Sequence, residues 1–380
     1  MRIGITCYPT YGGSGVVATE LGIELAALGH EVHFISYSQP FRLTGRNEGI
    51  FYHEVPVSNY PLFEFPPYDL ALASRMAEVA ELYELDLLHV HYAIPHSVSA
   101  LLARQILASK GRRLPFVTTL HGTDITLVGL DRSYLPITKY AIQESDGVTC
   151  ISAYLKEKTV ESFGITRPIE VVTNFVNCDV YVPINDEQKR AEERARFAAP
   201  HEPILMHLSN FRPVKRVVDV VKVFAQVAEQ MPAQLVLVGD GPDRSAAEWL
   251  AHDKGIQSRV HFLGKQERVH ELLPLADLML MPSEMESFGL AALEAMACGV
   301  VPAGTNVGGV PELITDGVDG CLEAVGDVVS LAGRTAQLLT EADLHAQMAA
   351  AARRTAVDRF STERLIPLYE AYYEQMLAAK

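Results

Sequence analysis

The residues of this sequence best suited to chemistry lie in one stretch, Pro282–Gly299, which reads PSEMESFGLAALEAMACG. An apolar run before it, Leu278–Met281, predicts a buried strand, and its Ala-, Leu- and Met-rich second half predicts a helix. The start of a helix attracts anions, because its first N–H groups lack partners and the positive end of its dipole lies there. Glu286 falls in the loop before this helix, and Glu294 falls about two turns later. These carboxylates could accept hydrogen bonds from hydroxyls on either side of a bound phosphate, as a sugar nucleotide would offer them.

Two glutamates at this spacing prove little by themselves, because most glutamates lie on a solvated surface. Their interpretation depends on the helices and strands that hold them, and the composition limits which class of protein these can form. At 380 residues the chain is long enough for two domains, and 48% hydrophobic and 21% charged residues are typical of a globular protein. The net charge of −15 argues against nucleic acid or an anionic membrane as a partner.

Membrane insertion and secretion are not expected. The sequence has no apolar run of about 18 residues, the length that a membrane span requires, and Met1–Thr6 enters a strand instead of a signal peptide. Its five cysteines are an odd number, lie far apart and form no C-x-x-C pair. We therefore expect reduced, buried thiols in a cytoplasmic protein, and no zinc site.

The first half of the chain alternates expected strands and helices. Arg2–Cys7 predicts a strand, Val16–Leu28 a helix and Glu31–Tyr37 a second strand, which is how a doubly wound parallel sheet begins. The loop before the helix, Tyr11–Gly15, is rich in glycine. Its small residues would let a diphosphate or a second substrate approach the backbone; the alternative is a tight turn without a ligand.

This glycine loop also fits a dinucleotide-binding pattern, because Gly13–Ala18 reads G-x-G-x-x-A. A nicotinamide enzyme of that kind carries an acidic residue at the end of the second strand, where it holds the ribose. The second strand ends here in Ile35–Ser38, which contains no acidic residue. We therefore do not interpret the loop as a nicotinamide site.

Polar residues follow three further expected strands of this half, Asp86–Tyr92, Pro115–Leu120 and Gly147–Cys150. The first ends in His91-Tyr92, and His121-Gly122-Thr123-Asp124 follows the second. A single histidine at a strand end is more often structural than functional. In an open parallel sheet, however, ligands bind at the carboxyl ends of the strands, so several polar ends at one edge favour a binding site there.

The second half repeats the alternation of strands and helices. Ile204–Leu208 and Gln234–Val238 are expected strands on either side of an expected helix, Val217–Met231. The loop before that helix, Ser209–Arg216, is basic, as an anion site in an acidic protein requires. Near the end of the chain, Thr362–Leu377 carries apolar residues at helical spacing and predicts an amphipathic helix.

Together these stretches resemble the retaining glycosyltransferases of family 4, whose E-x7-E signature matches Glu286 and Glu294. Gly304–Glu312, which reads GTNVGGVPE, is similar to the strand and loop that follow the signature in that family. The resemblance covers nearly the whole chain. It also includes the stretches MRIGITCYPTYGGSG, PFRL, FPPYDLALAS, HVHYAIPH, TTLHGTDIT, SNFRPVKR and LVGDGP.

The resemblance implies an α/β fold of the GT-B type, in which two Rossmann-like, doubly wound domains face a cleft. It implies an acceptor-binding domain at residues 1–175 and a UDP-sugar-binding domain at residues 176–360. The C-terminal helix, within residues 361–380, would pack back on the first domain.

The chain is similar in particular to a subfamily that transfers N-acetylglucosamine from UDP-N-acetylglucosamine to the hydroxyl of L-malate, with retention, at the start of bacillithiol biosynthesis. This implies two small-molecule substrates, no cofactor and no metal, and the sequence has no Asp-x-Asp pair. The resemblance also allows a homodimer. The alternatives are a related transferase with another small acceptor such as inositol phosphate, a UDP-sugar epimerase, and a nucleotide-sugar sensor. A lipid-directed transferase is disfavoured, because the helix residues Arg75–Leu85 are acidic.

The family's catalytic roles carry over to three residues. Glu286 would hold the transferred sugar, Lys215 would neutralise the leaving diphosphate, and His121 would lie near the 6-hydroxyl of the sugar. Most of the family has arginine five residues before the lysine, where this chain has Asn210; nearby arginines, Arg212 and Arg216, could supply the charge.

The family's binding roles carry over to a larger set. Glu294 would hold the ribose, and Arg268 would stack on the uracil. The implied donor-binding residues are Gly12, Gly13, Asn210, Gln266, Arg268, Ser287, Phe288, Gly289, Leu290 and Glu294. The implied acceptor-binding residues are Ser14, Tyr92 and Thr119, and a cation from among Arg42, Arg75 and Arg132 would complete a site for a dianion.

Overall fold

The computed structural model describes residues 1–10, 12–43, 48–57 and 61–378, so Tyr11 of the expected glycine loop lies outside the described residues. The chain divides into two compact units. Unit 1 comprises Met1–Asn174 together with the chain from Glu363 onward, and unit 2 comprises Phe175–Thr362. None of the helices in the described part of the chain is both long enough and apolar enough to span a membrane.

Unit 1 is built on a parallel sheet of seven strands in the order β3-β2-β1-β4-β5-β6-β7. The strands are β1 (Arg2–Thr6), β2 (Glu31–Ser36), β3 (Ile50–Glu54), β4 (Leu87–His91), β5 (Phe116–Leu120), β6 (Gly147–Cys150) and β7 (Glu170–Val171). The strand order reverses between β1 and β4, which is the position where doubly wound sheets bind ligands. The register pairs Ile3 of β1 with Leu87 of β4, and His91 of β4 with Thr119 of β5.

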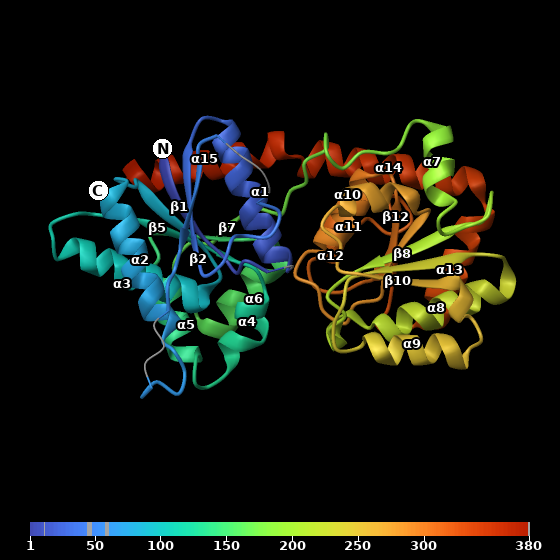
Figure 1. Ribbon diagram of the computed structural model, residues 1–380, viewed down its shortest axis with the longest axis horizontal. Helices are drawn as coiled ribbons and strands as arrows, with labels where there is room; N and C mark the ends of the chain where they lie inside the picture. The colour runs from blue at the N-terminus through green and yellow to red at the C-terminus, as the bar shows by residue number, and fades with distance from the viewer. Residues whose placement is uncertain (11, 44–47, 58–60, 379–380) are drawn as a thin grey trace. The chain divides into compact units, whose positions relative to one another are not determined.

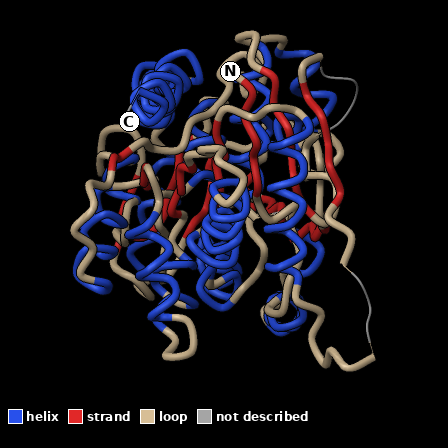
Figure 2. The backbone as a smooth tube through the Cα atoms, turned by 90° about the vertical axis from the view of Figure 1, so that its left-hand side faces the viewer, coloured by secondary structure: helices blue, strands red, loops and turns tan. Residues whose placement is uncertain are grey.

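Helices cover both faces of this sheet (Figures 1 and 2). They are α1 (Gly13–Ala27), α2 (Tyr68–Leu82), α3 (Val98–Ala108), α4 (Thr123–Thr126), α5 (Leu135–Glu144), α6 (Ala153–Phe163) and α15 (Thr362–Ala378), with short turns η1 (Ala93–Ser97) and η2 (Val128–Leu130). On one face, α2 and α3 pack against Ile35, Leu88 and Phe116 of the strands. On the other face α1 lies close to β2, where a Cβ on Gly22 would come within 2.4 Å of Phe34.

The C-terminal helix α15 packs on unit 1, as the sequence predicts. The hydroxyl of Tyr372 accepts a hydrogen bond from the backbone N–H of Val148 at 2.9 Å, and the hydroxyl of Tyr373 lies 2.7 Å from Nδ1 of His89. A Cβ on Gly147 would come within 2.7 Å of the Tyr372 ring, so glycine lets the helix approach strand β6.

Unit 2 is built on a second parallel sheet, of six strands in the order β10-β9-β8-β11-β12-β13. Its strands are β8 (Ile204–Leu208), β9 (Gln234–Val238), β10 (Val260–Gly264), β11 (Leu278–Met281), β12 (Val301–Thr305) and β13 (Cys321–Glu323). Its helices are α7 (Glu187–Arg194), α8 (Val217–Gln230), α9 (Arg244–Asp253), α10 (Val269–Leu272), α11 (Leu290–Ala297), α12 (Val310–Leu313), α13 (Val328–Thr340) and α14 (Ala342–Phe360), and its 3₁₀ turns are η3 (Pro213–Lys215), η4 (Gln257–Arg259) and η5 (Leu273–Leu275).

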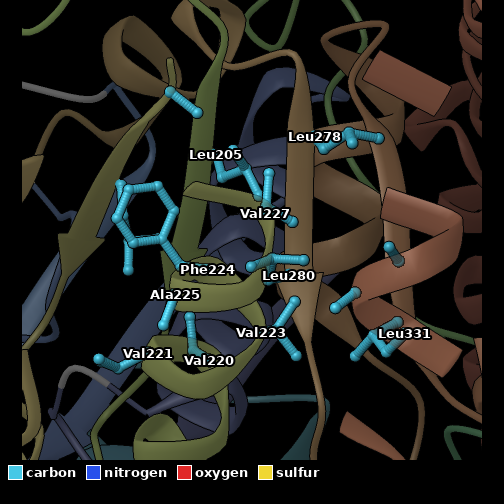
Figure 3. Close-up of a cluster of buried hydrophobic side chains, with 14 of the residues drawn as sticks. Leu205, Val220, Val221, Val223, Phe224, Ala225, Val227, Leu278, Leu280 and Leu331 are labelled. Carbon is cyan, nitrogen blue, oxygen red and sulfur yellow. The ribbon is translucent and has the colours of Figure 1, made fainter. Parts of the chain in front are cut away.

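The core of unit 2 fixes the loops that follow its central strands. Phe224 and the valines of α8 lie against Leu205 of β8, Leu280 of β11 and Leu331 of α13 (Figure 3). Each large apolar side chain buried in this way contributes about 1.5–3 kcal/mol to folding. The ends of β8 and β11, and the loops that begin there, are therefore held by a rigid base.

The five cysteines, Cys7, Cys150, Cys178, Cys298 and Cys321, are all buried and free of disulfides, as the sequence predicts. Burial raises the pKa of the Cys7 thiol to about 12, so it stays protonated near neutral pH.

Candidate active site

In unit 2, the basic loop after β8 is held against the loop after β9. A Cβ on Gly239 would come within 1.8 Å of the carbonyl oxygen of Ser209, and one on Gly241 within 2.0 Å of that of Asn210. Any side chain at either glycine would force the two loops apart. The chain then forms the short turn η3, which ends at Lys215, and enters α8 through Arg216 in the left-handed conformation (φ 50°).

Lys215 and Glu286, both expected to be catalytic, meet in the structure. The Lys215 ammonium lies 2.5 Å from Oε1 of Glu286, and the Ser283 hydroxyl donates to the same oxygen at 3.1 Å. The Lys215 side chain is 23% exposed and the Glu286 side chain 13%, so the ion pair is partly shielded but still reachable. The loops that carry them are tied together, because the N–H of Glu284 donates to the carbonyl of Val214 at 2.8 Å.

A buried histidine lies beneath this pair. Burial and the nearby Lys215 lower the pKa of His207 to about 4, so its ring is neutral near pH 7. One ring nitrogen lies 2.8 Å from the carbonyl of Leu280 and the other 2.8 Å from the hydroxyl of Ser209. His207 therefore joins the ends of β8 and β11 without adding charge to the site.

The start of α11, which follows the loop that holds Glu286, presents N–H groups without backbone partners in the described chain. Gly289 precedes the helix with a φ of 102°, a conformation that favours glycine. The N–H of Leu293 donates to the carbonyl of Gly289 at 3.1 Å. The N–H groups of Leu290, Ala291 and Ala292, which precede it in the helix, have no backbone partner among the described residues. With the ammonium of Lys215 nearby in the fold, unit 2 combines a cation with a helix N-terminus, which suits a phosphate.

Glu294 lies on α11 and is 4% exposed. The hydroxyl of Tyr181 donates to its Oε1 at 2.9 Å. Burying a carboxylate costs free energy unless hydrogen-bond donors meet it, so Tyr181 is part of the site although the sequence did not point to it.

The remaining expected donor-binding residues differ in what they offer. The Phe288 side chain is buried against Phe360, so only its backbone remains for a ligand, whereas Arg268 is 72% exposed and pairs with Glu271. The Gln266 amide donates to the carbonyl of Leu263 at 2.7 Å.

The two arginines expected to compensate for Asn210 differ in their ion pairs. Arg216 donates to the buried Asp219 at 2.6 Å and lies 3.6 Å from Glu284. Arg212 is exposed and has no ion-pair partner among the residues that the structure describes. Oδ1 of Asn210 is buried and has no hydrogen-bond partner within that same set.

In unit 1, the glycine loop opens α1 beside the end of β1. Gly12 precedes the helix, and Gly13, Ser14 and Gly15 form its first turn. A Cβ on Gly15 would come within 2.4 Å of the carbonyl of Tyr8, so this glycine is required by packing. The N–H of Val16 donates to the carbonyl of Gly12 at 3.2 Å. The N–H groups that precede it in this turn have no backbone partner in the described chain.

Aromatic rings gather at the ends of β1, β4 and β5, at the same edge of the sheet. Tyr92 stacks on His121 with ring centroids 5.5 Å apart and meets Tyr8 edge-on at 5.2 Å. Tyr92 has a φ of 88°, and its N–H donates to the carbonyl of Thr119 at 2.9 Å. The expected His121 and Tyr92 are thus in contact, next to the loop that carries Ser14.

His121 is held as a neutral ring. Its Nε2 lies 2.8 Å from Nδ1 of His91, and burial lowers the pKa of His121 to about 3. The buried carboxylate of Asp124 accepts hydrogen bonds from the N–H groups of His121 at 3.2 Å, Gly122 at 2.9 Å and Ala93 at 3.0 Å. Asp124 therefore joins the loops that follow β4 and β5.

Two protein-family profiles match the chain. "Glycosyltransferase Family 4" matches residues 11–180, and "Glycosyl transferases group 1" matches residues 188–355. The chain is 48% identical to the N-acetyl-alpha-D-glucosaminyl L-malate synthase of Bacillus anthracis over 377 residues, 99% of this chain and 97% of that protein. The chain belongs to glycosyltransferase family 4. It is also 29% identical to the D-inositol 3-phosphate glycosyltransferase of Nocardia farcinica over 366 residues, 87% of this chain and 78% of that protein.

Solved structures share the fold of this family 4 glycosyltransferase. Anabaena HepE in complex with UDP and glucose aligns with a TM-score of 0.82 at 19% identity, and the sucrose-phosphate synthase of Thermosynechococcus elongatus with 0.80 at 21%; each alignment covers 100% of both chains. These likenesses show the two-sheet GT-B fold that the sequence predicts.

Thr119 is placed differently from the expectation for an acceptor-binding side chain. It is fully buried, and its hydroxyl lies 2.6 Å from Nε2 of His89 and 2.6 Å from the hydroxyl of Thr149. His89 in turn contacts Tyr373 of α15. The side chain of Thr119 therefore joins the sheet to the C-terminal helix, and its carbonyl holds Tyr92.

The three arginines considered for the acceptor also differ. Arg42 lies 3.5 Å from Glu20, and Arg75 pairs with Glu78 at 2.5 Å. Arg132 is exposed on the turn before α5 and pairs with none of the described acidic residues. The described residues contain no cluster of three or more His, Cys, Asp or Glu side chains that could hold a metal ion.

Proposed function

We propose that this glycosyltransferase moves N-acetylglucosamine from UDP-N-acetylglucosamine to the hydroxyl of L-malate, with retention at the anomeric carbon. The observation that carries the proposal is the 48% identity to the Bacillus anthracis malate synthase, which extends over 99% of this chain. Such a match leaves little of either protein unaligned, and it includes both units.

Unit 2 supplies the groups for the donor. The N-terminus of α11 and the ammonium of Lys215 suit the diphosphate, and Glu294 suits the ribose hydroxyls. Glu286, in the loop before α11, is left to hold the sugar. The ion pair between Lys215 and Glu286 holds the ammonium and the carboxylate next to each other.

Unit 1 supplies the groups for the acceptor. Malate is a small dianion, and the loop N–H groups around Gly13 with the hydroxyl of Ser14 can serve one carboxylate. The hydroxyl of Tyr92 can serve the other carboxylate or orient the attacking hydroxyl. Of the three candidate arginines, Arg132 is the one without a competing carboxylate among the described residues. Thr119 acts through its carbonyl, which holds Tyr92.

The chemistry needs charge stabilisation more than a nucleophile. The bond between the anomeric carbon and the β-phosphate oxygen breaks, and the malate oxygen bonds to the same face of the sugar. The departing phosphate takes the proton of the malate hydroxyl, so no protein base is required. Because negative charge grows on the β-phosphate during this step, Lys215 and the α11 N–H groups stabilise the transition state more than the bound donor.

The test is UDP release from UDP-N-acetylglucosamine with L-malate, inositol phosphate or simple sugars as acceptor. We expect release that depends strictly on malate and a product with the α-configuration by NMR. Release with inositol phosphate alone would favour the activity named for the Nocardia farcinica relative. Conversion of the donor without any acceptor would favour an epimerase, and binding without turnover would favour a sensor.

A cytoplasmic location and a homodimer, both expected from the sequence, belong to the same proposal. Fractionation of cells that express the protein and light scattering of the purified protein test these two points.

A further inference from the structure

The carboxylate of Glu294 does not stand alone in unit 2. Tyr181, which is 5% exposed, donates its hydroxyl to Oε1 of Glu294 at 2.9 Å, although the two residues are 113 positions apart in the chain. The ring of Tyr181 meets His270 edge-on, with centroids 6.1 Å apart. His270 thus packs against the tyrosine ring, and the tyrosine hydroxyl points at the carboxylate.

A partly buried arginine fixes the backbone that carries Tyr181. Arg353 of α14 donates to the carbonyl of Tyr181 at 2.7 Å, to that of Cys178 at 2.9 Å and also to that of Ala297. Ala297 is the last residue of α11, the helix that bears Glu294. One guanidinium therefore sets the segment Cys178–Tyr181 in place relative to the helix, so the hydroxyl meets the carboxylate in a defined geometry.

This arrangement has a consequence for a ligand. A glutamate side chain has three rotatable bonds, and an unrestrained carboxylate loses that freedom when it binds a hydroxyl. A hydrogen bond that holds Oε1 beforehand removes part of this cost. The carboxylate oxygens accept hydrogen bonds, so they suit hydroxyl donors.

We propose that Tyr181 is a positioning residue for donor binding: it orients the Glu294 carboxylate towards the two ribose hydroxyls of the uridine nucleotide. The inference rests on the proposed function, which assigns the ribose to Glu294. Tyr181 itself does not touch the reacting atoms. Its effect appears in the affinity for the nucleotide and leaves the chemical step largely unchanged.

The experiment compares Tyr181→Phe with the wild type by calorimetric titration of UDP and of 2′,3′-dideoxy-UDP. We expect the variant to bind UDP about three- to thirtyfold more weakly, as the loss of one charge-assisted hydrogen bond predicts. Its affinity for dideoxy-UDP should equal that of the wild type within about twofold, because the hydroxyls that Glu294 meets are missing. In the transferase assay the donor KM should rise by a similar factor, with kcat and the malate KM nearly constant.

Tyr372→Phe is the matched control. Its hydroxyl also makes a hydrogen bond, which it accepts from the N–H of Val148, but this bond is partly buried, lies in unit 1 and involves no carboxylate. It should lower the melting temperature without changing the affinity for UDP. A Tyr181→Phe protein that binds UDP like the wild type, or that loses equal affinity for UDP and dideoxy-UDP, would overturn the inference. Wild-type protein that does not discriminate between the two nucleotides would instead overturn the ribose assignment in the proposed function, and the inference with it.

Discussion

Lys215 and Glu286 form an ion pair with each other, yet the proposed reaction needs each of them for a different part of the donor. The pair is partly shielded, so removing one partner leaves a charge that water only partly solvates. Mutation of either residue therefore changes the free protein as well as the complex. Turnover and nucleotide affinity must be measured separately to tell these effects apart.

Glu286→Gln should keep the fold and the affinity for UDP and should lower kcat about thirty- to two-hundredfold, which corresponds to the ~2–3 kcal/mol of a charged hydrogen bond. Glutamine can still accept from Ser283 but cannot hold the sugar as a carboxylate does. The check is kcat with both substrates saturating, together with the Kd for UDP. Glu284→Gln is the control, because Glu284 lies in the same loop and is 60% exposed. Near-normal turnover of Glu286→Gln would refute the sugar-holding role.

The acceptor residues separate into two kinds. Ser14→Ala and Tyr92→Phe should each raise the malate KM about five- to a hundredfold and leave the donor KM unchanged, since each removes one donor to a carboxylate. Thr119→Val should instead lower stability, by about 1–3 kcal/mol, because it leaves His89 and Thr149 without their shared partner. Steady-state kinetics with both substrates varied, and thermal melting, check the two outcomes. A specific rise of the malate KM in Thr119→Val at unchanged stability would return Thr119 to the acceptor site.

At the scale of elements, the sequence predicts best where burial is complete. The central strands β1, β4, β5, β8 and β11 are almost wholly buried, so their apolar runs show them clearly. Strand β3 was missed, because it lies at the edge of the sheet and only His53 of its residues is buried. Helix α2 begins at Tyr68, directly after Pro66 and Pro67.

The residues of the candidate site also divide into those that the sequence predicts and those that it does not. Glycine loops, polar strand ends and the two glutamates are local patterns, so they could be found in the sequence. The roles of Tyr181, Asp124 and His207 depend on partners far along the chain or on loops brought together by the sheet. The burial of the Thr119 hydroxyl depends on α15, which is distant in sequence, and no local pattern reports it.

Two glycines at the start of α1 allow the effects of packing and of ligand binding to be tested separately. Gly15→Ala should destabilise unit 1 by ~1–3 kcal/mol, because the new Cβ would lie 2.4 Å from the carbonyl of Tyr8. Gly12→Ala should leave the melting temperature unchanged, since among the described residues its Cβ would meet only Thr10, at 3.6 Å. If the loop approaches the diphosphate, however, Gly12→Ala should raise the donor KM. Melting curves and donor kinetics of both variants decide it, and an unaltered donor KM in Gly12→Ala would argue for a tight turn without a ligand.

At the scale of the whole molecule, an enzyme with a net charge of −15 is proposed to bind an anionic donor and a dianionic acceptor. The protein does not reverse its overall charge to do so. Each unit places N–H groups of a helix N-terminus at the carboxyl ends of its own parallel strands, and unit 2 adds Lys215. These groups act over a short distance, where the remote carboxylates are screened by salt.

Buried histidines give the molecule a defined response to acid. Burial lowers the pKa of His89 and His121 to about 3 and of His96 and His207 to about 4, against about 6.5 in the unfolded chain. Between these values the unfolded state binds more protons than the folded state, so stability is complete above pH about 6.5 and falls as the pH decreases towards 4. The slope is about 1.4 kcal/mol per pH unit for each such histidine. Melting temperature and proton uptake on unfolding, measured from pH 7.5 to 4.5, check this expectation, and His207→Asn should reduce the uptake by up to one proton. A melting temperature that stays constant over this range would show that these rings are protonated in the folded protein, and His121 could then no longer be treated as a neutral group in the site.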